Sequence, residues 1–598
     1  MALAELLGER FEVEHRIITA APGMGKSRLG AEFVSRVQQR GQPVAIWVGR
    51  GDSLRAGSTL DLLAQALRSA LDLHGGEPLA ERRDQIRDRI AGCVRETEHV
   101  RVAAFLGELV GAPFPDDDEA GAALRAARQD AQLMSEQMRK AWLDFLDAET
   151  SAHPILLVLE DLHWGDFGTA RFIDTALRDR GNRPWMVLAL ARPEVFEAFP
   201  RLWADRRNVQ EIRLKELSRK AGERLVRQVL GDSAGPKTID RLVERAEGNA
   251  LYLEELIRTA AEGKDDALPE TVLAMVETRL DRLPIEARRV LRAASVFGEV
   301  CWESGVAGLL GGAISGASVA QWIARLVEQE VLAARPSHRF AGEQELMFRH
   351  ALHREGAYAT LTDDDKRLGH RIAGEWLEQH GEVDPMVLAG HFNRGGQSER
   401  AARYYLRASE QAMQVLDLDA TMARADLGLA CSPPPELRLD LLGMRCEAAL
   451  QNLPRINETL GDAEELKRSA PRGSLPWLKG MIIYNVCTFI AGRIEDLLAS
   501  LALLREVDPA PDAARWMALA LLNGIHVHDT IGRVPESSAL EKQFRAIARS
   551  TWDQKPSARY WWHLAVGLRA SYADEDPWTG LVHSDAMQTI FEEIGGDV

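Results

Sequence analysis

Short apolar runs alternate with longer, periodically apolar stretches between residue 15 and about residue 215. Four runs are rich in β-branched and aliphatic residues and apolar on both faces: HRIIT (15–19), PVAIWVG (43–49), PILLVLE (154–160) and WMVLALA (185–191). Such runs are typical of a parallel sheet covered on both faces by helices. Helical periodicity lies between them at 28–40, 59–73 and 133–149, and the acidic Pro/Gly segment 113–121 is predicted to be a loop.

The strand signal nearly vanishes after residue 215. Residues 216–262 predict three helices joined at 233–237 and 247–250. Residues 268–330 are helical in pattern, and 331–350 alternates around a central turn, which predicts a β-hairpin and, with the helices before it, a winged-helix domain. From 366 onward only helices are predicted, with breaks roughly every 35–45 residues, as in stacked helical pairs of the tetratricopeptide type.

We therefore expect four domains in a chain of 598 residues. The fold class is an α/β P-loop NTPase domain followed by a helical lid, a winged-helix domain and all-α repeats. The expected boundaries are 1–215 for the NTPase core, 216–265 for the lid, 266–365 for the winged-helix-like domain and 366–598 for the repeats.

The composition mainly argues against several classes of protein. The net charge of -17 disfavours non-specific nucleic-acid binding, which needs clustered Lys and Arg. Five scattered cysteines form no CxxC pair, so neither a disulfide framework nor a zinc site is indicated. No apolar run is long enough to span a membrane, and the N-terminus shows no signal pattern, so we expect a cytoplasmic protein.

The turn after the first predicted strand has the chemistry of a phosphate-binding loop. Its residues are Ala20, Ala21, Pro22, Gly23, Met24, Gly25, Lys26 and Ser27, followed by Arg28 at the start of a predicted helix. In this motif, backbone N–H groups and the Lys bind phosphates and the Ser hydroxyl binds Mg²⁺. Ala20 replaces the usual first Gly, but its single methyl group is small. We expect all nine residues to contact ATP or ADP.

Two further strand ends extend this site. The strand 154–160 ends in adjacent acids, Glu160 and Asp161, and either carboxylate suits Mg²⁺ or the attacking water. The strand at 186–191 is followed by Arg192, which is either a γ-phosphate sensor or a surface residue before a proline.

A kinase-like string follows the acid pair. Asp166, Phe167 and Gly168 match the DFG signature of protein kinases, but no H-R-D string and no G-x-G-x-x-G loop occur in the chain. We predict that Asp166 is an N-cap and that the chain is not an active kinase by itself.

Seven strings in order resemble the STAND class of AAA-like ATPases found in bacterial multidomain regulators. They are APGMGKSRL (21–29), LLVLEDLHWGD (156–166), ALARPE (189–194), AEGNALYLEEL (246–256), the stretch 268–298, FRHALHREGAYATL (348–361) and AARYYLRASEQA (401–412). The first two resemble the Walker A and Walker B motifs, and the fourth resembles the G-N-P motif of the lid, with Ala250 in place of Pro. GERFEVEHRI (8–17) resembles the first strand of a bacterial Ser/Thr kinase, so we expect a relative of a kinase–ATPase fusion without the kinase body.

The resemblance implies a slow, ATP-binding signal-transduction switch. Lys26 and Ser27 would bind phosphate and Mg²⁺, Glu160 would bind the metal, and Asp161 would activate water. Exchange of ADP for ATP would open the protein, which would bind a protein partner through the repeats and form a nucleotide-dependent homo-oligomer.

Two other functions compete with this one. The first is a non-hydrolysing helical-repeat scaffold with a structural nucleotide. The second is a transcription regulator, which is disfavoured because the stretch 294–310 in the winged-helix region carries no Lys or Arg.

Overall fold

The computed structural model describes most of the chain in two compact units. The described residues are 14–41, 43–73, 76–116, 118–231, 235–261, 280, 283–312, 316–335, 339–510, 513–551, 563–564, 566–567 and 577–593. The first unit comprises 1–113 and 141–397, and the second comprises 114–140 and 398–598. The segment 114–140, which the sequence places inside the NTPase core, is thus grouped with the helical C-terminal part.

A five-stranded sheet organises the first unit. Its strands are β1 (His15–Thr19), β2 (Ala45–Arg50), β3 (Ile155–Glu160), β4 (Trp185–Ala191) and β5 (Val209–Arg213), in the order β2-β3-β4-β1-β5. All pairings are parallel. The four predicted strands are confirmed. β5 was not predicted, because it is an edge strand whose last four residues are exposed and so lacks an apolar run.

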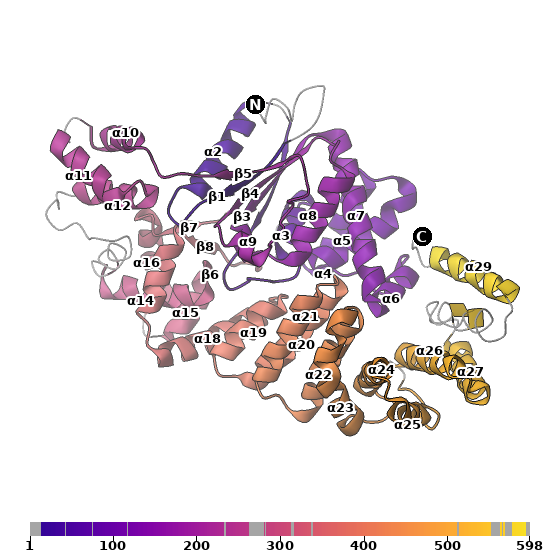
Figure 1. Ribbon diagram of the computed structural model, residues 1–598. Coiled ribbons are helices and arrows are strands. Elements are labelled where there is room, and N and C mark those ends of the chain that lie inside the picture. The colour runs from indigo at the N-terminus through magenta and orange to yellow at the C-terminus, as the bar shows by residue number, and fades with distance from the viewer. Residues whose placement is uncertain are drawn as a thin grey trace. The chain divides into compact units, whose positions relative to one another are not determined.

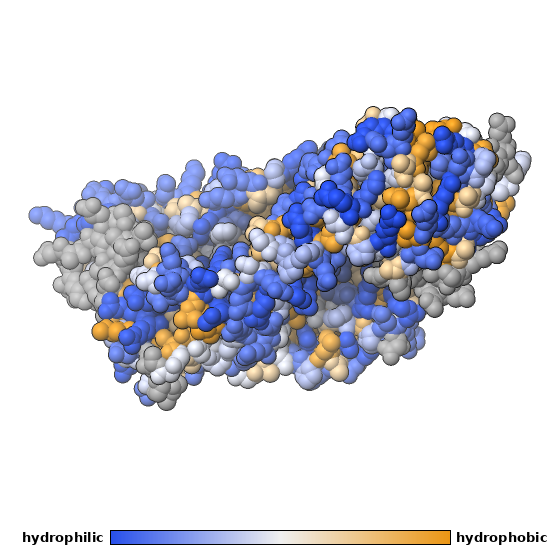
Figure 2. Space-filling view, turned by 90° about the horizontal axis from the view of Figure 1, so that it is seen from below, coloured by the Kyte–Doolittle hydropathy of each residue, from blue (hydrophilic) through white to orange (hydrophobic). Residues whose placement is uncertain are grey.

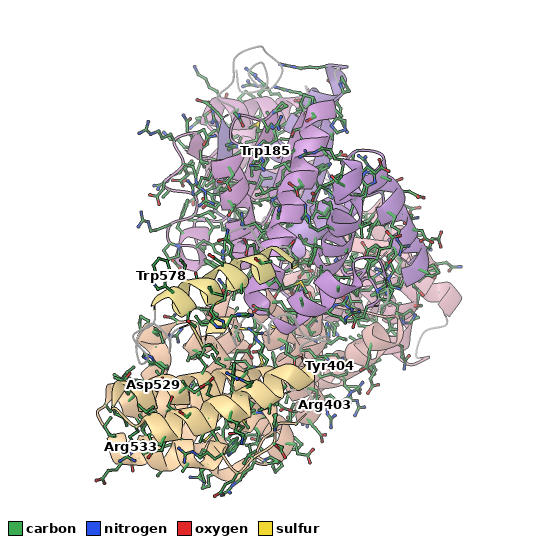
Figure 3. All side chains as sticks on the ribbon, turned by 90° about the vertical axis from the view of Figure 1, so that its right-hand side faces the viewer. Trp185, Arg403, Tyr404, Asp529, Arg533 and Trp578 are labelled. Carbon is green, nitrogen blue, oxygen red and sulfur yellow. The ribbon has the colours of Figure 1, made fainter. Side chains whose placement is uncertain are left out.

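Helices cover both faces of this sheet (Figure 1). They are α2 (Lys26–Gln39), α3 (Asp61–Ala70), α4 (Leu79–Ala91), α5 (His99–Val110), α7 (Ala131–Ala152), α8 (Phe167–Asp179) and the short α9 (Val195–Ala198). Val37 of α2 packs with Leu156 and Val158. Trp47, whose register partner Leu157 points to the opposite face from these two residues, stacks on Phe145 of α7. Trp185 at the start of β4 (Figure 3) is fully buried.

Helices and a small second sheet complete the first unit. α10 (Arg219–Leu230), α11 (Pro236–Ala246) and α12 (Ala250–Ala261) confirm the three helices predicted after 215. They are followed by α14 (Ile285–Phe297), β6 (Val300–Trp302), α15 (Glu303–Leu310), α16 (Gly316–Glu328), β7 (Leu332–Ala334) and β8 (Glu345–Phe348). The sheet order is β6-β8-β7, and β7 and β8 form the predicted antiparallel hairpin. This order of elements is that of a winged helix; the start of the helical stretch predicted at 268–330 lies outside the described residues. α17 (Ala351–Ala359), α18 (Asp363–Gln379) and α19 (Pro385–Arg394) end the unit.

The second unit is helical throughout its described part. It contains α6 (Gly121–Gln129), the beginning of α7, α20 (Ser398–Gln414), α21 (Leu418–Ala430), α22 (Pro435–Leu450), α23 (Leu460–Ser469), α24 (Leu475–Ile490), α25 (Ile494–Leu504), α26 (Ala514–Thr530), α27 (Val534–Thr551) and α29 (Pro577–Glu593). Two of the breaks expected from the sequence, CSPPP (431–435) and SAPRGS (469–474), coincide with the junctions between α21 and α22 and between α23 and α24.

The surface seen in Figure 2 is mostly hydrophilic, with small hydrophobic patches. Among the described residues, no helix combines the length and apolar character needed to cross a bilayer.

Candidate nucleotide-binding site

The turn between β1 and α2 has the backbone that phosphate binding requires. Gly23 and Gly25 have φ angles of 79° and 91°, in the left-handed region that favours glycine. Gly25 is the N-cap of α2 and provides no side-chain hydrogen bond, and the first turn contains no acidic residue. The N–H groups at this helix end are therefore not capped by the chain's own anion, which suits a phosphate.

Lys26 is held in place by the loop that it follows. Its Nζ donates hydrogen bonds to the carbonyl oxygens of Ala20 and Ala21, at 2.7 and 3.2 Å. Burial lowers the pKa of Lys26, and the nearby Asp161 carboxylate opposes this effect. Ser27 and Arg28 follow on the exposed side of the first turn. The predicted phosphate-binding residues thus lie together around one loop.

The lid motif touches the same loop. The Nδ2 of Asn249 donates to the carbonyl of Pro22 at 3.3 Å, and the N–H of Leu251 donates to the carbonyl of Gly23 at 2.9 Å. A Cβ atom on Gly23 would lie 2.7 Å from the Oδ1 of Asn249, so glycine is required for this approach. Neither contact was predicted. The only sequence signal was the string Gly248-Asn249-Ala250 between two helices.

Arg50 is a site residue that sequence reasoning missed. The parallel register of β2 and β3 places Arg50 opposite Glu160. The Nε of Arg50 donates to the Oε2 of Glu160 at 2.7 Å. Both side chains are largely buried, with 27% of Arg50 and 12% of Glu160 exposed. The carboxylate expected to bind the metal is therefore paired with an internal cation.

Asp161 lies beside this pair in a strained conformation. Its φ of 50° is in the left-handed region, which is uncommon for a residue with a Cβ and recurs at functional sites. Burial raises the pKa of Asp161, as does Glu160, while Arg50 and Lys26 oppose the rise. Gly51 makes the turn possible, because a Cβ there would lie 2.4 Å from the carbonyl oxygen of Asp161.

His163 connects the ends of β3 and β4, and it too was missed. Its Nδ1 accepts a hydrogen bond from the backbone N–H of Arg192 at 3.4 Å and lies 4.0 Å from the Oδ1 of Asp161. Burial, Arg192 and Lys26 lower the pKa of His163 to about 4, so the ring is neutral at pH 7. The charge of Arg192 also acts on Lys26 and Asp161. Arg192 thus lies within electrostatic reach of the loop, and its role as a phosphate sensor stays a prediction.

Residues of the winged-helix region face the acid end of the site. The Nη1 of Arg50 lies 3.5 Å from the Sδ of Met347 on β8. Glu299, just before β6, has its pKa raised to about 8 by burial and by Asp52 and Asp161. Burial is the largest cause of this shift, and the charges of the two carboxylates add to it.

Asp166 is an N-cap, as predicted. Its Oδ1 accepts from the N–H groups of Thr169 and Leu60, at 2.7 and 2.8 Å, and it begins α8. Burial raises its pKa to about 6, against the effect of these hydrogen bonds.

Comparisons with known proteins agree with this geometry in the N-terminal part. Residues 2–188 match the family model of the AAA ATPase domain. An uncharacterized protein of Rhizobium meliloti (strain 1021) is 24% identical over 415 residues, which cover 66% of this chain and 38% of that protein. The chain thus matches about two fifths of the length of this curated relative.

Two solved structures are similar at low identity. One is a STAND protein with a tetratricopeptide repeat sensor from Pyrococcus horikoshii, at 13% identity and a TM-score of 0.37, covering 97% of this chain and 81% of that one. The other is the Orc1 protein of Aeropyrum pernix in complex with DNA, at 15% identity and a TM-score of 0.26, covering 60% of this chain and 89% of that one. TM-scores this low carry no inference about activity.

Proposed function

We propose that this chain is a switch controlled by Mg²⁺ and ATP or ADP, with slow hydrolysis at the P-loop. The observation that carries the proposal is that two separate regions close on the nucleotide-binding loop and its acids. Asn249 of the lid contacts Pro22 at one end, and Met347 of the winged-helix region contacts Arg50, the partner of Glu160, at the other. The match of residues 2–188 to the AAA ATPase domain supports the nucleotide-binding part.

The residues present suit Mg²⁺-bound nucleotide. Lys26 and the N–H groups before α2 would hold phosphate, and Ser27 and Glu160 would hold the metal. Among the described residues there is no cluster of three or more His, Cys, Asp or Glu that could hold a metal by itself. That agrees with Mg²⁺, which is usually bound by one or two protein groups together with phosphates and water. Mg²⁺ would neutralise charge on the phosphates, while Asp161 would orient and deprotonate the attacking water.

Arg50 makes the switch slow. Arg50 contacts the Oε2 of Glu160, so its positive charge competes with Mg²⁺ for this carboxylate and weakens metal binding while the ion pair is intact. Because Arg50 also contacts Met347, movement of the winged-helix region changes the surroundings of the ion pair. The closed arrangement thereby disfavours metal binding.

Calorimetry on a loop variant tests nucleotide binding. Lys26→Ala removes the loop's buried cation and should abolish binding of Mg·ATP and Mg·ADP. Arg36→Ala, on an exposed turn of the same helix, is the matched control and should bind like the wild type. Equal binding by Lys26→Ala and the wild type would refute the proposal. ADP released on denaturing the purified protein would support a switch that retains its nucleotide.

A second function is favoured by the Arg50–Glu160 ion pair. If that pair persists with nucleotide bound, the chain is a non-hydrolysing scaffold whose helical part binds a partner. Single-turnover hydrolysis with the wild type, Glu160→Gln and Asp161→Asn separates the two functions. A rate that both substitutions abolish supports the ATPase, and no turnover in any of the three supports the scaffold.

The expected protein partner and homo-oligomer form part of the same proposal. Light scattering with Mg·ATP and with Mg·ADP tests the oligomer: an increase in mass with Mg·ATP alone supports it, and equal masses contradict it.

A further inference from the structure

The segment 114–140 folds with helices far away in the sequence. It includes α6 and the first turns of α7, and it belongs to the second unit with residues 398–598. We call it the insert segment. Arg128 of this segment forms an ion pair with Asp116 and donates to the carbonyl of Phe114 at 2.7 Å, so α6 is tied to the start of the segment.

Four helices of the second unit form one row. α20 packs on α22, α22 on α24, and α24 on α26. The helices between them, α21, α23 and α25, each pack against their chain neighbours. We call α20, α22, α24 and α26 the inner row. Figure 3 labels Arg403 and Tyr404 on α20 and Asp529 on α26, at the two ends of this row.

The insert segment contacts this row at two adjacent residues. Ala131 packs against the cluster formed by Met413 of α20 and Leu441 and Met444 of α22. The Oδ2 of Asp130 accepts a hydrogen bond from the Nη2 of Arg515 on α26 at 2.8 Å. Since α24 separates α22 from α26, the start of α7 spans the inner row.

Asp130 has a second role at the same position. Its Oδ1 accepts from the N–H groups of Gln132 and Leu133, at 3.0 and 3.3 Å, which caps α7. The carboxylate of Asp130 therefore caps α7 and also binds Arg515 of the inner row. Both partners of the ion pair are partly exposed, at 25% for Asp130 and 22% for Arg515, so a competing carboxylate can reach Arg515.

Charged side chains of both signs occur elsewhere in the inner row. Lys479 of α24 pairs with Glu447 of α22 and lies 5.3 Å from the ring centre of Trp516 on α26. Glu410 on α20 lies within electrostatic reach of Lys479, whose charge opposes the rise in the pKa of Glu410 caused by burial. Both signs of charge, next to an apolar cluster, match an amphipathic helix better than a polyanion.

We propose that the inner row is a binding face for an amphipathic helix with a carboxylate at its N-terminus, and that the insert segment is its intramolecular occupant. A protein partner offering such a helix competes with Asp130 for Arg515 and releases the insert segment. α7 continues from there to Ala152, three positions before β3, which ends at Glu160. An effect of this release on Glu160 would depend on the proposed function. The displacement of the insert segment does not depend on it.

Peptide binding to the full-length chain, without nucleotide, tests the displacement. The probe is a fluorescent peptide of residues 118–144, acetylated and amidated, followed by anisotropy. Asp130→Asn in the full chain removes the ion pair but keeps a good N-cap residue. Because a partly exposed ion pair is worth up to about 1 kcal/mol, this variant should bind the peptide about fivefold more tightly than the wild type. Glu119→Gln, an exposed acid of the same segment, is the matched control and should bind like the wild type.

Charge-reversal variants test whether the peptide binds at Arg515 of the inner row. The full chain with Arg515→Asp should reject the native peptide and bind a peptide carrying Asp130→Lys. The proposal is overturned if Asp130→Asn binds no more tightly than Glu119→Gln, or if Arg515→Asp does not discriminate between the two peptides. Because no nucleotide is present, a failed ATPase proposal leaves this result unchanged.

Discussion

At the scale of single residues, the main addition to the sequence prediction is Arg50, which pairs with Glu160, the acid proposed to bind the metal. Glu160 was predicted from the sequence, because its acid-ended apolar strand follows a phosphate-binding loop earlier in the chain. Arg50 was not, because its partnership depends on the register between two strands that lie 110 residues apart in the chain. The same holds for His163, whose neutral ring is explained only by burial and by nearby cations.

Replacing Arg50 should strengthen metal binding. Arg50→Gln removes the positive charge beside Glu160, so the carboxylate should attract Mg²⁺ more strongly. We expect the Mg²⁺ concentration that half-saturates nucleotide binding to fall several-fold, as measured by calorimetry with ATP at increasing Mg²⁺. Arg213→Gln, at an exposed end of β5, is the control and should have no effect. A higher Mg²⁺ requirement in Arg50→Gln would show that Arg50 assists the metal instead.

Gly51 should tolerate no side chain. The Cβ of Gly51→Ala would meet the carbonyl oxygen of Asp161 at 2.4 Å, so the strained turn must shift. We expect a loss of about 1–3 kcal/mol in the free energy of unfolding, measured by urea denaturation, together with weaker Mg²⁺ binding. Gly390→Ala on α19 is the control, because a Cβ at that position would meet no atom within 4 Å. Equal stability of the two variants would contradict the close approach.

At the scale of elements, apolar runs predicted what is buried and failed where an element is exposed. β1, β3 and β4 are buried and were predicted, whereas the exposed edge strand β5 was not. The β7–β8 hairpin was predicted from its alternation and turn. The contact of this hairpin with Arg50 could not be predicted, because that contact depends on how the winged-helix region packs against the sheet.

Glu299 should make stability fall as the pH rises. Burial, Asp52 and Asp161 raise its pKa from 4.5 to about 8, so between these values the folded chain holds a proton that the unfolded chain has lost. The free energy of unfolding therefore decreases with rising pH in this window, by about 1.4 kcal/mol per unit, and levels off above pH 8. Glu299→Gln has no titratable carboxyl group at this position, so its free energy of unfolding lacks this pH dependence.

Urea denaturation from pH 5.5 to 8.5 measures this effect. The stability of Glu299→Gln relative to the wild type should rise with pH and level off near pH 8. Glu286→Gln, an exposed acid at the start of α14, should follow the wild type throughout. Parallel curves for wild type and Glu299→Gln would mean that the pKa of Glu299 is not raised in the folded chain.

At the scale of the whole molecule, a buried ion cluster holds the first unit together. Arg55 follows β2 and pairs with Asp61 at 3.0 Å and with Glu382, between α18 and α19, at 2.8 Å. Arg339 also reaches Glu382, at 3.2 Å. Burial opposes the charge on Glu382, but Arg55 and Arg339 lower its pKa to about 2. The loop after the strand that ends at Arg50 is thereby tied to the last helices of the unit.

Breaking this cluster should loosen the first unit and leave the second intact. Glu382→Ala leaves Arg55 buried without its main partner, which costs about 3–5 kcal/mol. Tryptophan fluorescence in urea should show an earlier transition for the first unit, followed through residues such as the buried Trp185, and an unchanged one for the second, which contains the buried Trp477. Glu378→Ala, on an exposed position of α18, should change neither. If Glu382→Ala shifts both transitions equally, the two units unfold together; if it shifts neither, the cluster does not stabilise the fold. Because Glu382 is ionised down to about pH 2, the wild type should also keep this contribution at neutral pH and lose it as the pH falls below 4.5.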